Sequence, residues 1–248
     1  MATFLPQRLD KAFSKTSFSA GTNLKTLMAA SIANPAYVVY FDDFLGQTAG
    51  TWPASANWGY PATVGTNTEV IGITANTIGG ALTLTTAGTS GDSAFQSVGR
   101  HWNGTKGFYS IFKANATTIT TAKFEIGMVD SVTTNEAIAT KATPTFNMTT
   151  GAVFAYDTTD DSNVTFITAA GGVVGANADW TGTLVAGTDL IFEIVGAGGI
   201  ATGFINGQRV GSGAITAATA LTPYFGALTR TAATRALVVD YAGCIGPR

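Results

Sequence analysis

Carboxylates are the side chains with which this sequence could do chemistry, and their spacing limits what that chemistry is. One segment holds three carboxylates and one amide within seven residues, namely Asp157, Asp160, Asp161 and Asn163. Hard oxygen ligands of this kind suit calcium, although the segment lacks the glycine and the final glutamate of an EF-hand loop. A hairpin turn rich in Asp and Asn has the same composition. We favour the turn and keep a calcium site as the alternative.

Cleavage of a glycosidic bond usually needs two carboxylates about 5–10 Å apart. Glu125 and Glu193 are each followed, on their own face of a predicted strand, by glycine or valine rather than by a second acid. Asp42 and Asp43 are adjacent, so in a strand they point to opposite faces. We therefore predict no catalytic residue and no enzymatic activity. We also expect Glu125→Gln and Glu193→Gln to leave stability unchanged.

The single histidine and the single cysteine restrict the remaining chemistry. One His (His101) and one Cys (Cys244) cannot build a tetrahedral zinc site. A Ser-His-Asp triad would have to use His101, and the chain has no Gly-x-Ser-x-Gly elbow. Apart from the calcium alternative, we predict no metal and no cofactor.

Tryptophans raise the question of carbohydrate binding, because exposed rings stack on sugars. Trp52 and Trp58 lie in a segment rich in Pro and Gly, and Trp102 follows His101. These three rings are our candidates for glycan stacking. The alternative is that they fill the ends of the fold or a seam between subunits.

Composition excludes several classes of protein. The chain has 248 residues, of which 46% are hydrophobic and 11% are charged, and it includes 30 glycines. A disordered protein would combine high charge with few aromatics, whereas aromatics here make up 10%. The net charge of −2 provides no basic surface for nucleic acid. No window approaches the roughly 18 consecutive apolar residues of a membrane span.

The first 36 residues differ from the rest and are predicted to form an extended, partly helical arm. Four basic residues against one acid (Asp10) give this segment a charge of 4 − 1 = +3. Its large apolar side chains are too few for a core of their own, so we expect the arm to serve in anchoring and assembly. The alternative is that it folds back on its own domain. The candidate interface residues are Phe4, Leu5, Arg8, Lys11, Phe13 and Phe18.

Residues 37–248 are predicted to form one antiparallel β-sandwich. In residues 122–129, Phe124, Ile126 and Met128 alternate with polar residues or glycine, which predicts a strand with one buried face. Residues 189–195 repeat this pattern with Phe192 and Ile194. The dipeptide Asn206-Gly207 favours a type I′ hairpin turn. Many short strands of this kind, without a convincing helix after residue 36, indicate a sandwich or jelly roll.

Three stretches carry a resemblance to known families. DLIFEIVGAGGIATGFINGQRVG (residues 189–211) and the closing strand in residues 221–246 resemble concanavalin A-like (LamG-type) jelly rolls. The opening YVVYFDDFLG (residues 37–46) is similar to the first body strand of structural proteins from tailed bacteriophages. The resemblance covers residues 37–246 and leaves out the arm.

The resemblance implies a virion component on the outer surface of the particle. The main expectation is a non-enzymatic head decoration or cement protein that binds the major capsid protein or other virion proteins, as a homo-oligomer with a trimer favoured. The alternative is a tail-fibre or receptor-binding module that recognises a cell-surface glycan. Neither nucleic acid nor membrane is expected as a partner.

Overall fold

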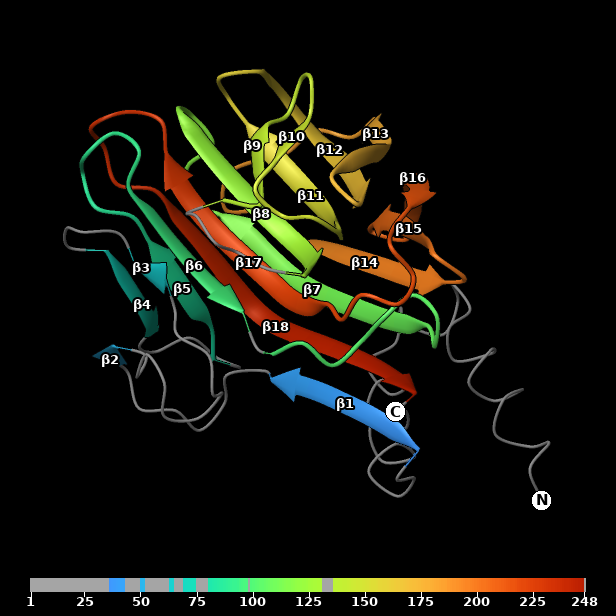
Figure 1. Ribbon diagram of the computed structural model, residues 1–248. Coiled ribbons are helices and arrows are strands. Elements are labelled where there is room, and N and C mark those ends of the chain that lie inside the picture. The colour runs from blue at the N-terminus through green and yellow to red at the C-terminus, as the bar shows by residue number, and fades with distance from the viewer. Residues whose placement is uncertain are drawn as a thin grey trace.

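The computed structural model describes residues 36–42, 50–51, 63–64, 69–74, 80–97, 99–130 and 136–247. These residues form two antiparallel sheets packed face to face and one two-stranded ribbon (Figure 1). None of them belongs to a helix that is long and apolar enough to span a membrane. The described part therefore confirms the predicted antiparallel β-sandwich, while the arm of residues 1–36 lies, except for Ala36, outside it.

The larger sheet has nine strands, and β1 pairs with β18 beside the main path. Its strands are, in spatial order, β16 (Gln208–Ala214), β15 (Ile200–Ile205), β14 (Leu190–Ala197), β7 (Phe108–Ala116), β18 (Ala236–Pro247), β5 (Leu82–Thr85), β4 (Val70–Ile73) and β2 (Gly50–Thr51), with β1 (Tyr37–Asp42) alongside β18.

The second sheet has seven strands. They are β13 (Val173–Asp179), β12 (Asp161–Ala170), β11 (Gly151–Asp157), β8 (Ala122–Val129), β17 (Thr222–Thr229), β6 (Ser93–Ser97) and β3 (Thr63–Val64). The ribbon pairs β9 (Ile138–Thr140) with β10 (Thr145–Phe146).

The core lies between the two sheets and follows the period of two in the sequence. Phe124, Ile126 and Met128 of β8 and Phe192 and Ile194 of β14 all belong to one buried cluster, which confirms the predicted inward faces. Aromatic rings join the sheets directly, as in the pair Phe154–Phe192, whose ring centroids are 5.3 Å apart.

The opposite face of β8 is buried as well, which the sequence analysis did not predict. All eight residues of β8 are buried, including Lys123 and Glu125. The reason is that the β9–β10 ribbon lies over this face of the sheet, where Ile138 belongs to one buried cluster with Val129 and Val153 (Figure 1). The outer face of the seven-stranded sheet is therefore an interior surface around the ribbon.

Turn residues and glycines complete the sandwich. Asn206 and Gly207 both have positive φ, at 50° and 72°, so the predicted type I′ geometry of the β15–β16 hairpin is confirmed. On one side of the molecule the edge strands β13 and β16 contact each other. Glycines permit this approach, because a Cβ on Gly175 would lie 2.5 Å from the carbonyl oxygen of Ala214.

Candidate functional site

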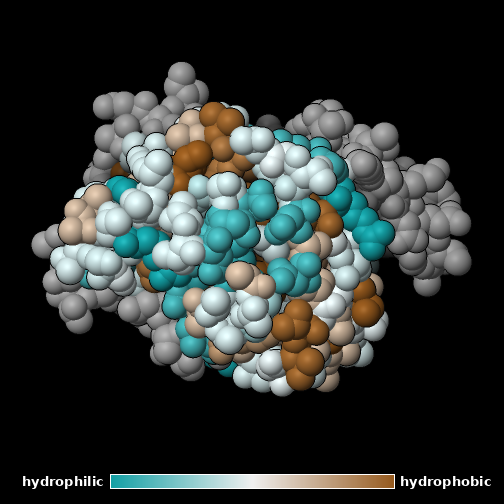
Figure 2. Space-filling model, turned by 90° about the horizontal axis from the view of Figure 1, so that it is seen from above, coloured by the Kyte–Doolittle hydropathy of each residue, from teal (hydrophilic) through white to brown (hydrophobic). Residues whose placement is uncertain are grey.

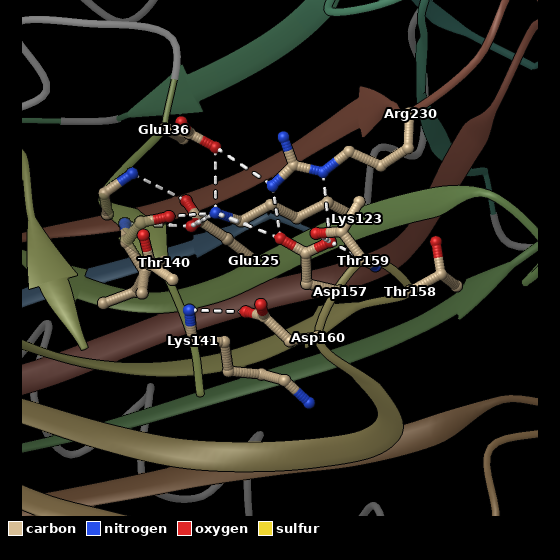
Figure 3. A network of polar contacts seen from close by, with 12 residues as sticks. Lys123, Glu125, Glu136, Thr140, Lys141, Asp157, Thr158, Thr159, Asp160 and Arg230 are labelled. Carbon is tan, nitrogen blue, oxygen red and sulfur yellow. Dashed lines mark hydrogen bonds and ion pairs between the residues drawn. The ribbon is translucent and has the colours of Figure 1, made fainter. Parts of the chain in front are cut away.

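A network of charged side chains occupies the outer face of the seven-stranded sheet beneath the β9–β10 ribbon (Figure 3). Lys123 and Glu125 are two residues apart on β8 and so share this face, and each side chain is only 1% exposed. Asp157 lies directly opposite Lys123 on β11. Glu136 comes from the segment before β9, and Arg230 follows β17, so four segments of the chain supply this one network.

Glu125 fastens the ribbon to the sheet. Its Oε2 accepts hydrogen bonds from the amide of Ala137 at 2.7 Å and from the hydroxyl of Tyr224 at 2.8 Å. Its Oε1 accepts one from the amide of Ile138 at 2.9 Å. Burial, followed by the charge of Glu125, raises the pKa of Tyr224 well above its usual value. The phenol therefore stays protonated and remains a donor to the carboxylate.

Lys123 lies at the centre of the network. Its Nζ is 2.8 Å from Glu136 Oε2, 3.2 Å from Glu125 Oε1 and 3.8 Å from Asp157 Oδ2, and it also donates to the carbonyl of Ile138. Burial alone lowers the pKa of a lysine, but the surrounding negative charges outweigh it and the pKa of Lys123 is raised. The amine is thus held in its charged form.

Asp157 and Arg230 form a bidentate pair at the outer end of the network. Arg230 Nε donates to Asp157 Oδ1 at 3.0 Å, and Nη2 donates to Oδ2. Thr159 also donates to Oδ1 through its amide at 3.1 Å and its hydroxyl at 2.8 Å. Burial alone raises the pKa of Asp157, but these donors outweigh it and the pKa is lowered.

The network opens to solvent at two of its members. The side chains of Arg230 and Glu136 are 20% and 19% exposed, and Arg230 Nη2 lies 3.7 Å from Glu136 Oε2. Two cations and three carboxylates give the five residues a formal charge of 2 − 3 = −1. Each charged group is fixed by several partners, so the exposed groups present donors and acceptors in a set geometry.

The turn between β11 and β12 extends this polar surface. Asp160 accepts hydrogen bonds from the amides of Lys141 and Ala142 at 2.7 and 3.1 Å. Asp161 pairs with Lys141 Nζ and accepts from the amide of Asn163 at 2.7 Å. Figure 2 looks onto the end of the molecule at which β9, β10, β12 and β13 lie, and it shows hydrophilic side chains gathered in the middle of the view.

The calcium prediction finds no support in this geometry. Asp157 pairs with Arg230, Asp160 binds backbone amides and Asp161 pairs with Lys141, so the three carboxylates do not converge on one point. Within the described ranges, no group of three His, Cys, Asp or Glu residues could hold a metal ion. The segment is the Asx-rich hairpin turn that the sequence analysis favoured.

Trp102 requires a correction. Its side chain belongs to the core and is 2% exposed, and Nε1 donates to the carbonyl of Val38 at 3.3 Å. A bridge between Trp102 and Leu221 holds its backbone in place. A buried ring cannot stack on a glycan, so the prediction for Trp102 is wrong. Trp52 and Trp58, like the six candidate interface residues of the arm, lie outside the described residues.

The sequence analysis missed most of the network. It placed Glu125 on a solvated face, but this carboxylate is buried and shares Lys123 with Glu136 and Asp157. Contrary to the expectation from the sequence, these contacts lead us to expect that Glu125→Gln lowers stability. The sequence did carry one signal for this network, the pair Lys123 and Glu125 on one face of a strand. Opposite charges at i and i+2 can bind the same segment of the chain where it lies over the sheet.

Comparisons with known proteins give a fold but no family. No protein-family model and no curated protein sequence matches the chain. Among solved structures, peanut lectin is similar at 9% identity and a TM-score of 0.59, over 86% of this chain and 98% of the lectin. A second similar structure shares 9% identity at a TM-score of 0.54, over 83% of this chain and 97% of that one. It is described under endo-acting O-glycanases, which members of the human gut microbiota express to initiate mucin breakdown. The likeness confirms the concanavalin A-like jelly roll.

The same likenesses contradict the prediction that the chain is not an enzyme. The structure described under O-glycanases, at a TM-score of 0.54, is the likeness that overturns this prediction. Enzymes thus share this fold with lectins, and the absence of a carboxylate pattern along one strand does not separate the two. The carboxylates of Glu125, Glu136 and Asp157 come from three segments, which a search along one strand overlooks.

Proposed function

We propose that the protein binds carbohydrate at the open end of the charged network on the seven-stranded sheet. The observation that carries the proposal is the similarity to peanut lectin over 86% of this chain and 98% of the lectin. This observation favours the glycan-recognition alternative of the sequence analysis over capsid decoration.

The local chemistry supports the same substrate class. Sugar hydroxyls both donate and accept hydrogen bonds, so they bind where fixed donors and acceptors alternate. Arg230 supplies donors, Glu136 and Asp161 supply acceptors, and all three are partly exposed. Because Asp157 and Lys141 already hold Arg230 and Asp161, little side-chain entropy is lost when a ligand binds.

A glycan array probed with the full chain tests the proposal, followed by calorimetry on each glycan that binds. Asp161→Asn should weaken binding by about tenfold, since a hydrogen bond to a charged group is worth about 1.5–3 kcal/mol. Asp189→Asn is the matched control: its side chain is 42% exposed against 39% for Asp161, and it also pairs with a lysine, but on the other sheet. It should bind as the unmodified chain does.

An array without any bound glycan, or equal affinity for the Asp161→Asn and unmodified chains, would contradict the proposal. Mass spectrometry of the glycans recovered from the binding assay shows whether they are also cleaved. Catalysis would then be assigned by the loss of cleavage in carboxylate variants that still bind.

A place on the outer surface of a virion remains a prediction from sequence resemblance. We propose it only as the setting in which a glycan-binding surface would reach a host cell. Mass spectrometry of purified phage particles would detect the chain there, and its absence from the particles would contradict this setting. The predicted contact with a major capsid protein and the predicted trimer depend on the same experiment.

A further inference from the structure

We propose that residues 1–35 bind the outer face of the nine-stranded sheet of their own chain. This docking face consists of the outward side chains of β14, β7 and β18 around Ile111 and Lys113. It lies on the opposite sheet from the proposed glycan site, so the two proposals are independent.

The docking face has a pronounced apolar part. Tyr109, Ile111 and Ile245 form a cluster on it that is separate from the core between the sheets. Five half-buried side chains pack around this cluster, namely Tyr37, Val39, Ile191, Val195 and Tyr241. In the described part of the chain, β7 contacts chiefly its sheet neighbours β14 and β18 and, across the core, β8. These described strands lie beside β7 or across the core from it, while Tyr109, Ile111 and Ile245 on the outer side are only 3–4% exposed.

The docking face is also acidic. Lys113 Nζ lies 2.6 Å from Asp240 Oδ2 and 3.0 Å from Asp189 Oδ2. Glu193 accepts a hydrogen bond from the hydroxyl of Tyr109 at 2.7 Å. One lysine against three carboxylates gives a formal charge of 1 − 3 = −2. A partner with both cations and large apolar side chains would complement such a surface.

The N-terminal segment has that composition. It carries four basic residues and one acid, a charge of 4 − 1 = +3, together with Phe4, Leu5, Phe13 and Phe18. Opposite charges of this size attract each other at low salt, and the attraction weakens as salt screens it.

The chain also enters the fold at the border of the docking face. β1 begins at Tyr37 and pairs with β18, with Val39 opposite Ile245 in the apolar cluster. An extended chain spans about 3.3 Å per residue, so a segment of this length can reach every part of the face. Because segment and face are joined covalently, their effective concentration is high, on the order of millimolar.

Cross-linking in the full chain tests the proposal. A double variant with Ser17→Cys in the segment and Val195→Cys on the docking face is treated with a short bismaleimide. The control joins Ser17→Cys with Val173→Cys, which is on β13 of the other sheet and 68% exposed. The native Cys244 is buried, and burial raises the pKa of its thiol well above the usual value, so it does not compete.

The Val195 pair should cross-link at least fivefold more than the Val173 pair, and 0.5 M salt should lower its yield. Mixing chains labelled with ¹⁵N and unlabelled chains shows by mass whether a cross-link joins one chain or two. Equal yields for the two pairs, or cross-links only between two chains, would overturn the proposal. Thr202→Cys, opposite Val195 on β15, replaces Val195→Cys if that variant does not fold.

A second measurement removes the apolar anchors instead. The reference is the full chain with Val195→Cys as its single substitution. Adding Phe13→Ser and Phe18→Ser to this chain should raise the rate of thiol labelling at position 195 by at least threefold. Far-UV circular dichroism confirms that the sandwich is intact in this variant. An unchanged labelling rate in a folded variant would overturn the proposal.

Discussion

Replacing Glu125 by glutamine tests whether the buried network holds the β9–β10 ribbon in place. Glutamine keeps the shape of the side chain but turns one carboxylate oxygen into an NH₂ group. That group must face either Ala137 N–H and the hydroxyl of Tyr224 or Ile138 N–H and Lys123, because these donors lie at the two oxygens. In both orientations at least one backbone amide of the ribbon loses its acceptor.

The structure sets the size of the effect. Removing one partner of a buried ion pair costs about 3–5 kcal/mol, and a hydrogen bond to a charged group is worth about 1.5–3 kcal/mol. Lys123 keeps Glu136 and Asp157 as partners, which reduces the loss. We expect the free energy of unfolding to fall by about 2–4 kcal/mol. For a domain of this size, that lowers Tm by roughly 5–15 °C.

Urea unfolding followed by circular dichroism measures the change, with calorimetry for Tm. Glu193→Gln is the control, because Glu193 also accepts a tyrosine hydroxyl, from Tyr109 at 2.7 Å, but at the half-exposed outer face of the other sheet. It should lose less than about 1 kcal/mol, as surface substitutions usually do. If Glu125→Gln unfolds within about 0.5 kcal/mol of the unmodified chain, the network does not anchor the ribbon.

Three further substitutions probe the core, the network and the sheet. Phe192→Ala should lower the free energy of unfolding by about 3–5 kcal/mol in urea titrations, since the ring is buried between the sheets, and a loss below 1 kcal/mol would contradict that packing. Because the folded-state pKa of Asp157 is below its ordinary value, its charge stabilises the fold above about pH 4, and this contribution is lost as the pH falls through the folded-state pKa. Urea midpoints between pH 2 and 6 should therefore depend less on pH in Asp157→Asn, and an unchanged profile would argue against the role given to this group. Gly226→Ala should strongly lower Tm because its Cβ would overlap the ring of Phe95, whereas Gly88→Ala, with no atom within 4 Å of the added Cβ, should not; equal Tm values would refute the assigned contact.

The inward faces of the strands could be predicted from the sequence because they depend on local alternation. Phe124, Ile126 and Met128 recur at every second position, and this pattern fixes their side of the sheet whatever the rest of the chain does. The turn at Asn206 and Gly207 was predictable for a similar reason, since only a few residues adopt positive φ without strain.

The charged network could not be predicted in the same way, because its contacts join residues distant in sequence. Lys123 and Glu125 look like an ordinary solvated strand face until the ribbon at Ile138 is placed above them. Whether that face is exposed to solvent or buried depends on the path of the chain after β8, which the alternation of apolar and polar residues does not encode. Trp102 shows the same limit, since its burial depends on the backbone of Val38 and Leu221.

The contact between β13 and β16 bears on aggregation. The edge strands of a sandwich present unpaired amides and carbonyls, which can recruit a strand from another molecule. Here the two edges face each other so closely that a Cβ on Gly213 would lie 2.5 Å from the carbonyl carbon of Gly175. No foreign strand fits between them. Larger residues at these glycines would separate the two edges, so such variants should form intermolecular β-structure, and lose solubility, before they lose the core.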